Sequence, residues 1–492
     1  MGDSWPWKIL KYASSTVQLL DYLVLPKYLS LKSNHSGIGS FTVVDGKLVE
    51  GADAGITFFL DVDKIGSSRA QAVAELLQEL NEDVKGFHLA EDPVTLIETR
   101  PEYFLQFSIV ISTEVPESSL LKLAEVLWIA KIPLVVVRSV GFIGYFRIVV
   151  PEHTVVETHP DNVVDLRLDK PFSALEQYVM TFDFDSMDNM DHGHIPYVVI
   201  LLKYLDQWKL EHDGNLPKTY SERDEFKSMI SRGRRNFDEE NFDEALSNAW
   251  KAYTSSKVPH EVEELFNDSA CENITSNSSN FWIIMRAVRD FVTNEGQGLL
   301  PLAGAVPDMK AYTSGYVALQ TVYRQKAKQD VAIIRTRVDD ILRSIGRTTD
   351  SIHDEEIDVF CKNAAYIKVI RYRSLQEEYI SDQKKVEIDA ATFFSEGDPE
   401  EASEATKSEF EAFKAQVHTL LEDLQISNIP EHLDDYIHEI CRAGGSELPS
   451  IAAFVGGLVS QEVIKLITRQ YIPVNNTCIF DGVKSAASTY IL

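Results

Sequence analysis

Strands alternate with helices between Gly37 and Val150, and this alternation constrains the fold more than any other feature of the chain. Apolar runs of strand length alternate with amphipathic runs of helical length, at Ser40–Val44, Ser68–Asn81, Ser108–Ile111, Glu117–Ala130 and Leu134–Arg138. Such alternation is typical of a parallel sheet covered by helices. The predicted fold class is therefore α/β.

The middle of the chain has a different pattern. From Pro151 to about Arg442 amphipathic helices dominate, at Tyr197–Glu211, Phe281–Asn294 and Leu319–Arg343. The C-terminal segment returns to the first pattern, with a small-residue helix at Ser450–Thr468 and a strand at Cys478–Phe480. We therefore predict one α/β domain made of residues 37–150 and 443–492, interrupted by a mainly helical insertion over residues 151–442.

Charge and apolar patterning exclude two classes of partner. The chain of 492 residues has 76 acidic and 47 basic residues and a formal net charge of −29, whereas nucleic acids and anionic membranes attract basic surfaces. The longest apolar stretch, Ile132–Val150, contains two arginines, so no membrane span is expected. We expect neither nucleic acid nor membrane as a partner.

Cysteine and histidine placement gives no metal or disulfide signature. The four cysteines have no close pair, which excludes a zinc-ribbon spacing and fits a reducing compartment, so we expect the cytoplasm or the nucleus. His192 and His194 lie beside Asp191, but without a second cluster we expect them to cap the helix that begins near Pro196. Gly141 and Gly144 are expected to serve a tight turn.

The segment Val43–Ala70, VVDGKLVEGADAGITFFLDVDKIGSSRA, begins in a buried strand that ends at Asp45. Open α/β sheets bind ligands at this end of their strands. The segment resembles the nucleotide site of the adenylating enzymes that activate ubiquitin-like modifiers, where Asp-x-Asp, Asn-x-x-Arg-Gln and Gly-x-x-Lys-Ala follow the strand. The resemblance implies a ThiF-like adenylation fold.

Only part of that nucleotide site remains. Asp45 and Gly66 are kept, and the other positions are replaced: the second Asp by Lys47, the Asn by Asp53, the Arg-Gln pair by Ile56 and Thr57, and the Lys by Arg69. A triphosphate needs cations and hydrogen-bond donors where this chain has an aliphatic side chain and an extra carboxylate. We expect a degenerate site that binds no cofactor.

Three further stretches extend the resemblance. Leu300–Asp330 is similar to the helical domain of these enzymes, and Ser450–Gly482 is similar to their closing helix and strand. Thr158–Phe172 resembles the regulatory subunits of the neddylation-pathway activating enzyme. In that family the regulatory chain pairs with a catalytic chain, which carries the ATP site, the magnesium and the thioester cysteine.

The remaining active-site groups are also missing. Val115 stands where active members have a magnesium-binding Asp, with Glu114 and Glu117 on either side. A thioester-forming cysteine needs a depressed pKa in an exposed position. Cys271 is flanked by carboxylates, and Cys361, beside Lys362, is the least implausible nucleophile; we expect it to be a small buried side chain. We therefore predict no catalytic residue and no metal ligand.

Two regions depart from the regulatory subunits. Residues 1–36 form an atypical N-terminus in which Leu23–Pro26 is similar to the end of the family's first helix and Lys27–Ser36 intrudes; an intron read as coding, or a wrong start, would produce this pattern. The acidic tract Ser395–Ala412 is expected to be a linker or a solvated helix.

The resemblance implies a regulatory subunit of a heterodimeric activating enzyme. Its partners would be the catalytic subunit, the ubiquitin-like modifier and the conjugating enzyme, with Phe58 and Phe59 as candidate interface residues. The alternatives are the small subunit of the SUMO activating enzyme, a self-sufficient ATP-dependent adenylating enzyme, and an inert truncated isoform or scaffold.

Overall fold

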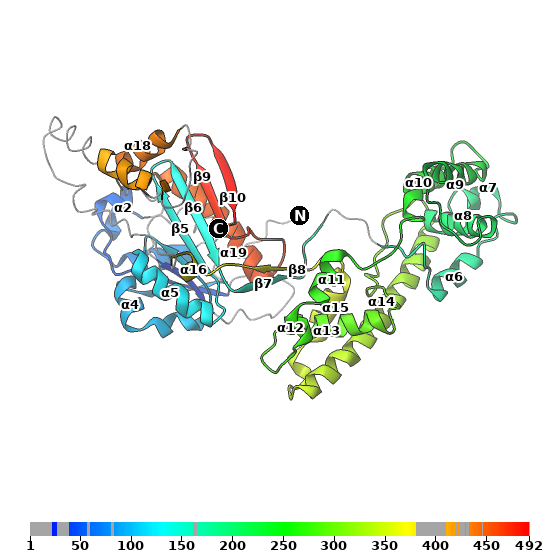
Figure 1. Ribbon diagram of the computed structural model, residues 1–492, viewed down its shortest axis with the longest axis horizontal. Coiled ribbons are helices and arrows are strands. Elements are labelled where there is room, and N and C mark those ends of the chain that lie inside the picture. The colour runs from blue at the N-terminus through cyan, green and yellow to red at the C-terminus, as the bar shows by residue number, and fades with distance from the viewer. Residues whose placement is uncertain are drawn as a thin grey trace. The chain divides into compact units, whose positions relative to one another are not determined.

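The computed structural model divides the chain into two compact units, Met1–His153 with Val369–Leu492, and Thr154–Lys368 (Figure 1). It describes residues 22–26, 39–56, 60–79, 83–160, 165–379, 410–419, 421–422, 429, 432–444 and 446–491. Of the atypical N-terminus the backbone of Tyr22–Pro26 is described, and most of the acidic tract at 395–412 lies outside the described residues.

The first unit is built on an eight-stranded sheet with the order β10-β9-β6-β5-β4-β1-β2-β3. Its strands are β1 (Tyr22–Pro26), β2 (Ser40–Val44), β3 (Lys85–Leu89), β4 (Phe107–Thr113), β5 (Leu134–Val140), β6 (Ile143–Val149), β9 (Thr477–Asp481) and β10 (Ala486–Tyr490). The pair β4/β5 is parallel, as the sequence predicts; β2 also pairs in parallel with β3, a strand that the sequence analysis did not predict, and the other pairs are antiparallel. The sheet is therefore mixed.

Strand β1 corrects one expectation. The resemblance assigns Leu23–Pro26 to the end of a helix, but Val24 pairs with Thr42 of β2 on one side and with Val110 of β4 on the other. The run Tyr-Leu-Val-Leu is apolar and contains no helix-periodic polar face, which suits a strand in the middle of a sheet.

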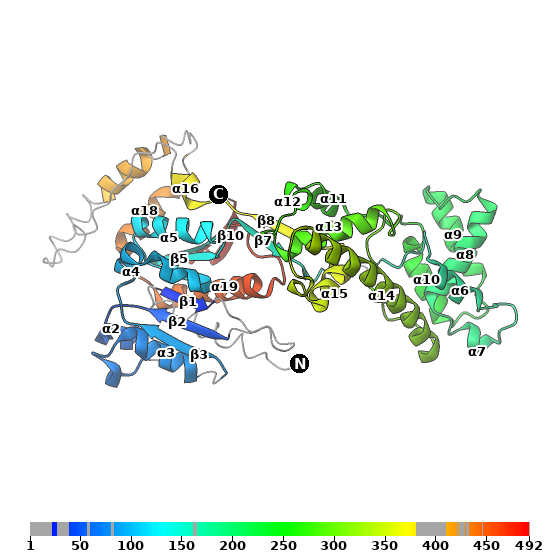
Figure 2. The same ribbon diagram turned by 90° about the horizontal axis from the view of Figure 1, so that it is seen from below.

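Helices cover both faces of this sheet (Figure 2). The helices of the first unit are α2 (Gly51–Ile56), α3 (Arg69–Glu79), α4 (Pro93–Thr99), α5 (Glu117–Ile129), α16 (Leu375–Tyr379), α18 (Leu433–Ala443) and α19 (Pro449–Thr468). Ile109 and Ile111 of β4 belong to the core with α3 and α19, while Val110 between them belongs to the core with α4 and α5. This alternation of side chains is the period of two that a strand buried on both faces requires.

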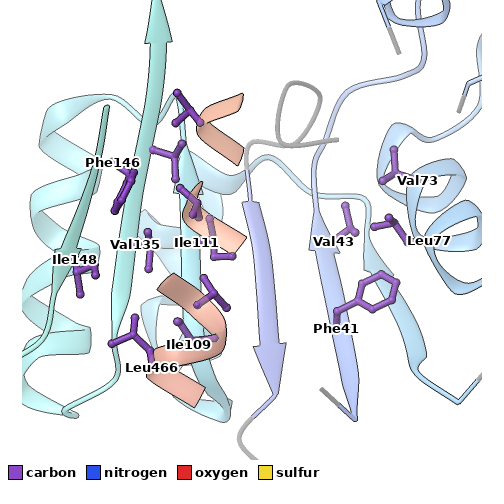
Figure 3. Close-up of a cluster of buried hydrophobic side chains, with 14 of the residues drawn as sticks. Phe41, Val43, Val73, Leu77, Ile109, Ile111, Val135, Phe146, Ile148 and Leu466 are labelled. Atoms are coloured by element: carbon purple, nitrogen blue, oxygen red, sulfur yellow. The ribbon is translucent and has the colours of Figure 1, made fainter. Parts of the chain in front are cut away.

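The C-terminal segment is part of the first unit's core. Figure 3 shows Phe41 and Val43 of β2 facing Val73 and Leu77 of α3, and the same buried cluster continues to Leu466 on α19. Strand β9 completes the sheet by pairing with β6. By length and composition alone α19 could also cross a membrane, but Ile451, Val455, Val459, Val463 and Leu466 are buried in this core.

The chain re-enters the first unit earlier than the sequence analysis places it, at Val369 instead of residue 443. Ile370 and Tyr372 are buried in the core with α19. Leu375 packs with α5 on the other face, where the Gln376 side-chain amide donates to the Leu121 carbonyl at 2.7 Å. These few residues carry no periodic pattern of their own, so the sequence gives no signal of this return.

The second unit is helical. Its helices are α6 (Ser173–Met180), α7 (Asn189–His192), α8 (Tyr197–Glu211), α9 (Tyr220–Arg232), α10 (Glu240–Asn248), α11 (His260–Phe266), α12 (Ser269–Glu272), α13 (Asn280–Thr293), α14 (Thr313–Ser344) and α15 (Asp354–Asn363). The chain leaves the first unit through β7 (Glu152–Val155) and returns through β8 (Lys368–Arg371), and these two strands pair. The buried Tyr323 hydroxyl of α14 donates to the Leu166 carbonyl at 2.7 Å.

Candidate functional site

Asp45 follows β2 at the carboxyl end of the parallel strands and is fully buried. Its backbone N–H donates to the Leu89 carbonyl at the end of β3 (3.1 Å), and its Oδ1 accepts the Lys47 N–H at 2.8 Å. A Cβ on Gly46 would lie 2.7 Å from the backbone nitrogen of Asp92, so only glycine fits this turn. The sequence Asp-Gly therefore turns the carboxylate of Asp45 back toward the protein.

Arg69, the first residue of α3, occupies the space beside that carboxylate. Its Nε donates to Asp45 Oδ2 at 2.5 Å, and its Nη1 lies 3.5 Å from Asp53 Oδ1 on α2. The second oxygen of Asp53 accepts the Glu50 N–H at 2.7 Å. Arg69 and Asp53 are 8% and 9% exposed. One guanidinium thus serves two buried carboxylates, and we call these three residues the Asp45–Arg69–Asp53 network.

Two described parts of the chain between the ends of this network, residues 46–56 and 60–68, are hydrogen-bonded to each other. Val49 N–H donates to the Ser67 carbonyl and Gly66 N–H donates to the Val49 carbonyl, both at 2.9 Å. Gly66 has a φ of +86°, which favours glycine. Three large aliphatic side chains in these residues are exposed, those of Leu48 (58%), Val62 (75%) and Ile65 (46%).

The predicted site residues are brought together in part. Asp45, Asp53 and Arg69 meet, whereas the Lys47 side chain is exposed to solvent. Ile56 ends α2, with a side chain outside the described part of the chain, and Thr57, Phe58 and Phe59 also lie outside the described residues. The contact between Asp45 and Arg69 joins residues far apart in the sequence, so the sequence analysis did not predict it.

A nucleotide triphosphate does not fit this arrangement. Phosphate oxygens need cations and N–H donors that are not already paired with other groups. Arg69, which stands where active members have Lys, is already bound by two carboxylates, and the network has an excess of one negative charge. Bringing a triphosphate here would add like charge to buried carboxylates.

The predicted magnesium position is apolar. Val115 is 3% exposed and packs in the core with α5, while the Arg138 guanidinium donates to its carbonyl. Glu114 and Glu117 on either side are exposed. An isopropyl group cannot coordinate a hard cation, which requires oxygen ligands.

Glu447 is a half-buried carboxyl near this edge that the sequence analysis did not identify. It bonds the Ser139 hydroxyl at the end of β5, and residues 141 and 447 form a β-bridge. The pKa of Glu447 is raised to about 7, mainly by burial; the hydrogen bond from Ser139 opposes this shift, and the negative charge of Glu114 contributes to it. The segment that carries Glu447 reaches this edge only through tertiary packing, so no local pattern in the sequence indicates its position.

The cysteine environments disfavour nucleophilic chemistry. Burial raises the pKa of Cys271 to about 11, although Arg289 and Arg286 act in the opposite direction. Burial also raises the pKa of Cys361, which is 1% exposed on α15, and that of Cys478. A nucleophilic thiolate needs the opposite shift and an accessible sulfur.

The two histidines do not cap α8, contrary to the expectation. His192 is buried, its Nδ1 lies 2.9 Å from Glu239 Oε1, and its ring stacks on Phe242. His194 stacks on Tyr312. Pro196 precedes α8 and makes no side-chain cap bond. Within the part of the chain that the structure describes, no group of three or more His, Cys, Asp or Glu side chains is arranged to hold a metal ion. Gly141 does serve a turn, between β5 and β6, with a φ of +53°.

Comparisons with known proteins show what the chain as a whole is similar to. The ThiF family model matches residues 31–490. The chain is 40% identical to the NEDD8-activating enzyme E1 regulatory subunit of Xenopus laevis, covering 98% of this chain and 94% of that protein. It is 40% identical to the NEDD8-activating enzyme E1 regulatory subunit AXR1 of Arabidopsis thaliana, covering 91% of this chain and 87% of that protein. Among solved structures, E. coli MccB with ATP is 18% identical over 24% of this chain and 36% of that chain, with a TM-score of 0.21.

Proposed function

Because the chain belongs to the ThiF family and, within it, to the NEDD8-activating enzyme E1 regulatory subunits, we propose that it is the non-catalytic half of a heterodimer with a catalytic subunit. The catalytic subunit would bind ATP and magnesium, adenylate the ubiquitin-like modifier and carry it as a thioester. The conjugating enzyme that receives the modifier would be a further partner. We place this activity in the cytoplasm or the nucleus.

The observation that carries the proposal is the Asp45–Arg69–Asp53 network. It occupies the carboxyl end of β2, where an adenylating member of this fold would hold the nucleotide, and it has an excess of carboxylate. The adenylation fold is therefore retained, while the charged groups at this position pair with one another instead of binding a nucleotide. A retained fold without its chemistry is best explained by a structural role toward a second copy of the same fold.

The segment 46–68 is the proposed pairing surface. Phe58 and Phe59 are its sequence-predicted contacts, and Leu48, Val62 and Ile65 are its exposed aliphatic side chains. Obligate interfaces are broad and apolar, on the order of 2,000 Å² or more. A partner that completes half of an active site must also be held in fixed geometry.

Reconstitution tests this function. The chain is co-expressed with the catalytic subunit, and the complex is sized by light scattering and tested for the modifier thioester. We expect a 1:1 complex with the thioester on the partner, and weaker pairing for Leu48→Asp. Leu210→Asp is the matched control, because Leu210 is 88% exposed on α8 of the other unit. A chain that stays monomeric beside a folded catalytic subunit contradicts the proposal.

A further inference from the structure

Arg69 connects three separate elements around the segment 46–68. Asp45 follows β2, Asp53 lies on α2, and Arg69 begins α3, so the two contacts of one guanidinium tie the beginning, the middle and the end of the segment together. The backbone N–H of Arg69 also donates to the Lys47 carbonyl at 3.1 Å. The planar guanidinium presents several donors in a fixed geometry, which an ammonium group does not.

The composition of the network is a poor solution for stability alone. Asp45 and Asp53 both pair with Arg69; the Asp45 side chain is fully buried, and the side chains of Arg69 and Asp53 are 10% and 13% exposed. Burying charges is costly, and well-packed apolar residues of similar size are often as stable or more stable. What a directional bridge supplies, and an apolar cluster does not, is one defined conformation of the segment that it spans.

We propose that Arg69 is a positioning residue that fixes the backbone of residues 46–56 and 60–68, so that the exposed side chains of Leu48, Val62 and Ile65 are preorganised to contact the catalytic subunit. This inference rests on the proposed function, because the catalytic subunit is the partner named there. The two chain segments that carry Leu48 and Ile65 are hydrogen-bonded to each other through Val49 and Gly66, so the bridge fixes both. A surface that is ordered before binding loses less conformational entropy when the partner docks.

The decisive variant neutralises all three groups of the network at once. In the triple variant Asp45→Asn, Asp53→Asn and Arg69→Met, the amide oxygens can still accept the N–H groups of Lys47 and Glu50 that the two carboxylates accept now. Arg69→Met alone leaves two buried carboxylates without their cation and serves to show the cost of that imbalance. Val73→Ala is the matched control, because Val73 is a buried apolar residue on the same helix whose truncation lowers stability and leaves the bridge intact.

Three readouts separate positioning from folding. We expect the full-length triple variant to keep the wild-type thermal midpoint, while backbone amides of 46–56 and 60–68 exchange with deuterium at least tenfold faster. We expect its dissociation constant for the catalytic subunit to rise at least tenfold. At saturating concentrations of the variant, the kcat of modifier-dependent ATP–pyrophosphate exchange should equal that of the wild-type pair.

The other outcomes contradict either the positioning role of Arg69 or the proposed function. If the triple variant exchanges and pairs like the wild type, or if Val73→Ala weakens pairing as much, Arg69 has no positioning role, although the proposed function stands. If the wild-type chain does not bind the catalytic subunit, the proposed function fails and the docking role of Arg69 fails with it.

Discussion

Replacing Gly144 with alanine should separate helix α19 from the sheet that it covers. A Cβ at this position of β6 would lie 2.4 Å from Val455 Cγ2 on α19, whereas carbon atoms in contact lie about 3.5–4.0 Å apart. Val455 is 1% exposed, and a valine in a helix is held in essentially one rotamer, so the clash cannot be relieved by a side-chain rotation. The helix or the strand must therefore move by roughly 1 Å.

Overpacking of this kind lowers the free energy of unfolding by about 1–3 kcal/mol. Replacing glycine also makes the unfolded chain less flexible, which offsets about 0.5 kcal/mol of that loss. The net cost of about 0.5–2.5 kcal/mol should make the amides of β4 and β5 exchange with deuterium about two- to sixtyfold faster, since about 1.4 kcal/mol corresponds to a factor of ten. Gly457→Ala on the exposed side of α19 is the control. Its Cβ would meet nothing within 4 Å, so it should slow exchange or leave it unchanged. Equal exchange in both variants would refute the packing of α19 against β6.

The other predictions concern single groups. Burial raises the pKa of Glu447 to about 7, so its protonated form favours folding below the ordinary carboxyl pKa, and this contribution is lost as the pH rises to about 7. Between pH 5 and pH 8, the free energy of unfolding of Glu447→Gln should therefore rise by about 1–2 kcal/mol relative to that of the wild type, as measured by urea unfolding. Identical pH profiles for the two proteins would count against this prediction. Cys271→Ser and Cys361→Ser should leave thioester formation by the heterodimer intact; a lost thioester with unchanged folding would reassign the nucleophile. Tyr323→Phe should lower the free energy of unfolding by about 1–2 kcal/mol, because it leaves the buried Leu166 carbonyl unpaired. Amide exchange should become faster in α14 and stay unchanged in β4.

Periodic elements were predictable, because their patterns are local. The predicted helix Tyr197–Glu211 and strand Ser40–Val44 match α8 and β2 in their bounds. Strand β1 was not predictable, because a short apolar run is compatible with a helix or a strand until its neighbours are known. The close approach of α19 to the sheet is at Gly144 of β6, whereas Gly457 of the small-residue helix faces open space.

The degenerate site was predictable as a set of substitutions but not as a structure. The loss of the Arg-Gln pair at Ile56 and Thr57 is visible in the sequence once the resemblance is recognised. The contact of Arg69 with Asp45 depends on how α3 packs beside β2, which no local pattern encodes. The earlier return of the chain at Val369 was missed for the same reason, since Ile370 and Tyr372 are recognisable as core residues only in the folded protein.

Modifier-dependent exchange of labelled pyrophosphate into ATP tests the central claim most directly. The purified chain is assayed alone with magnesium and the modifier, and then with the catalytic subunit added at equal concentration. The account predicts no exchange above background for the chain alone and steady exchange by the pair, because Arg69, which stands where active members have Lys, is paired with Asp45 and Asp53. Steady exchange by the chain alone, at a rate that the partner does not change, would contradict it.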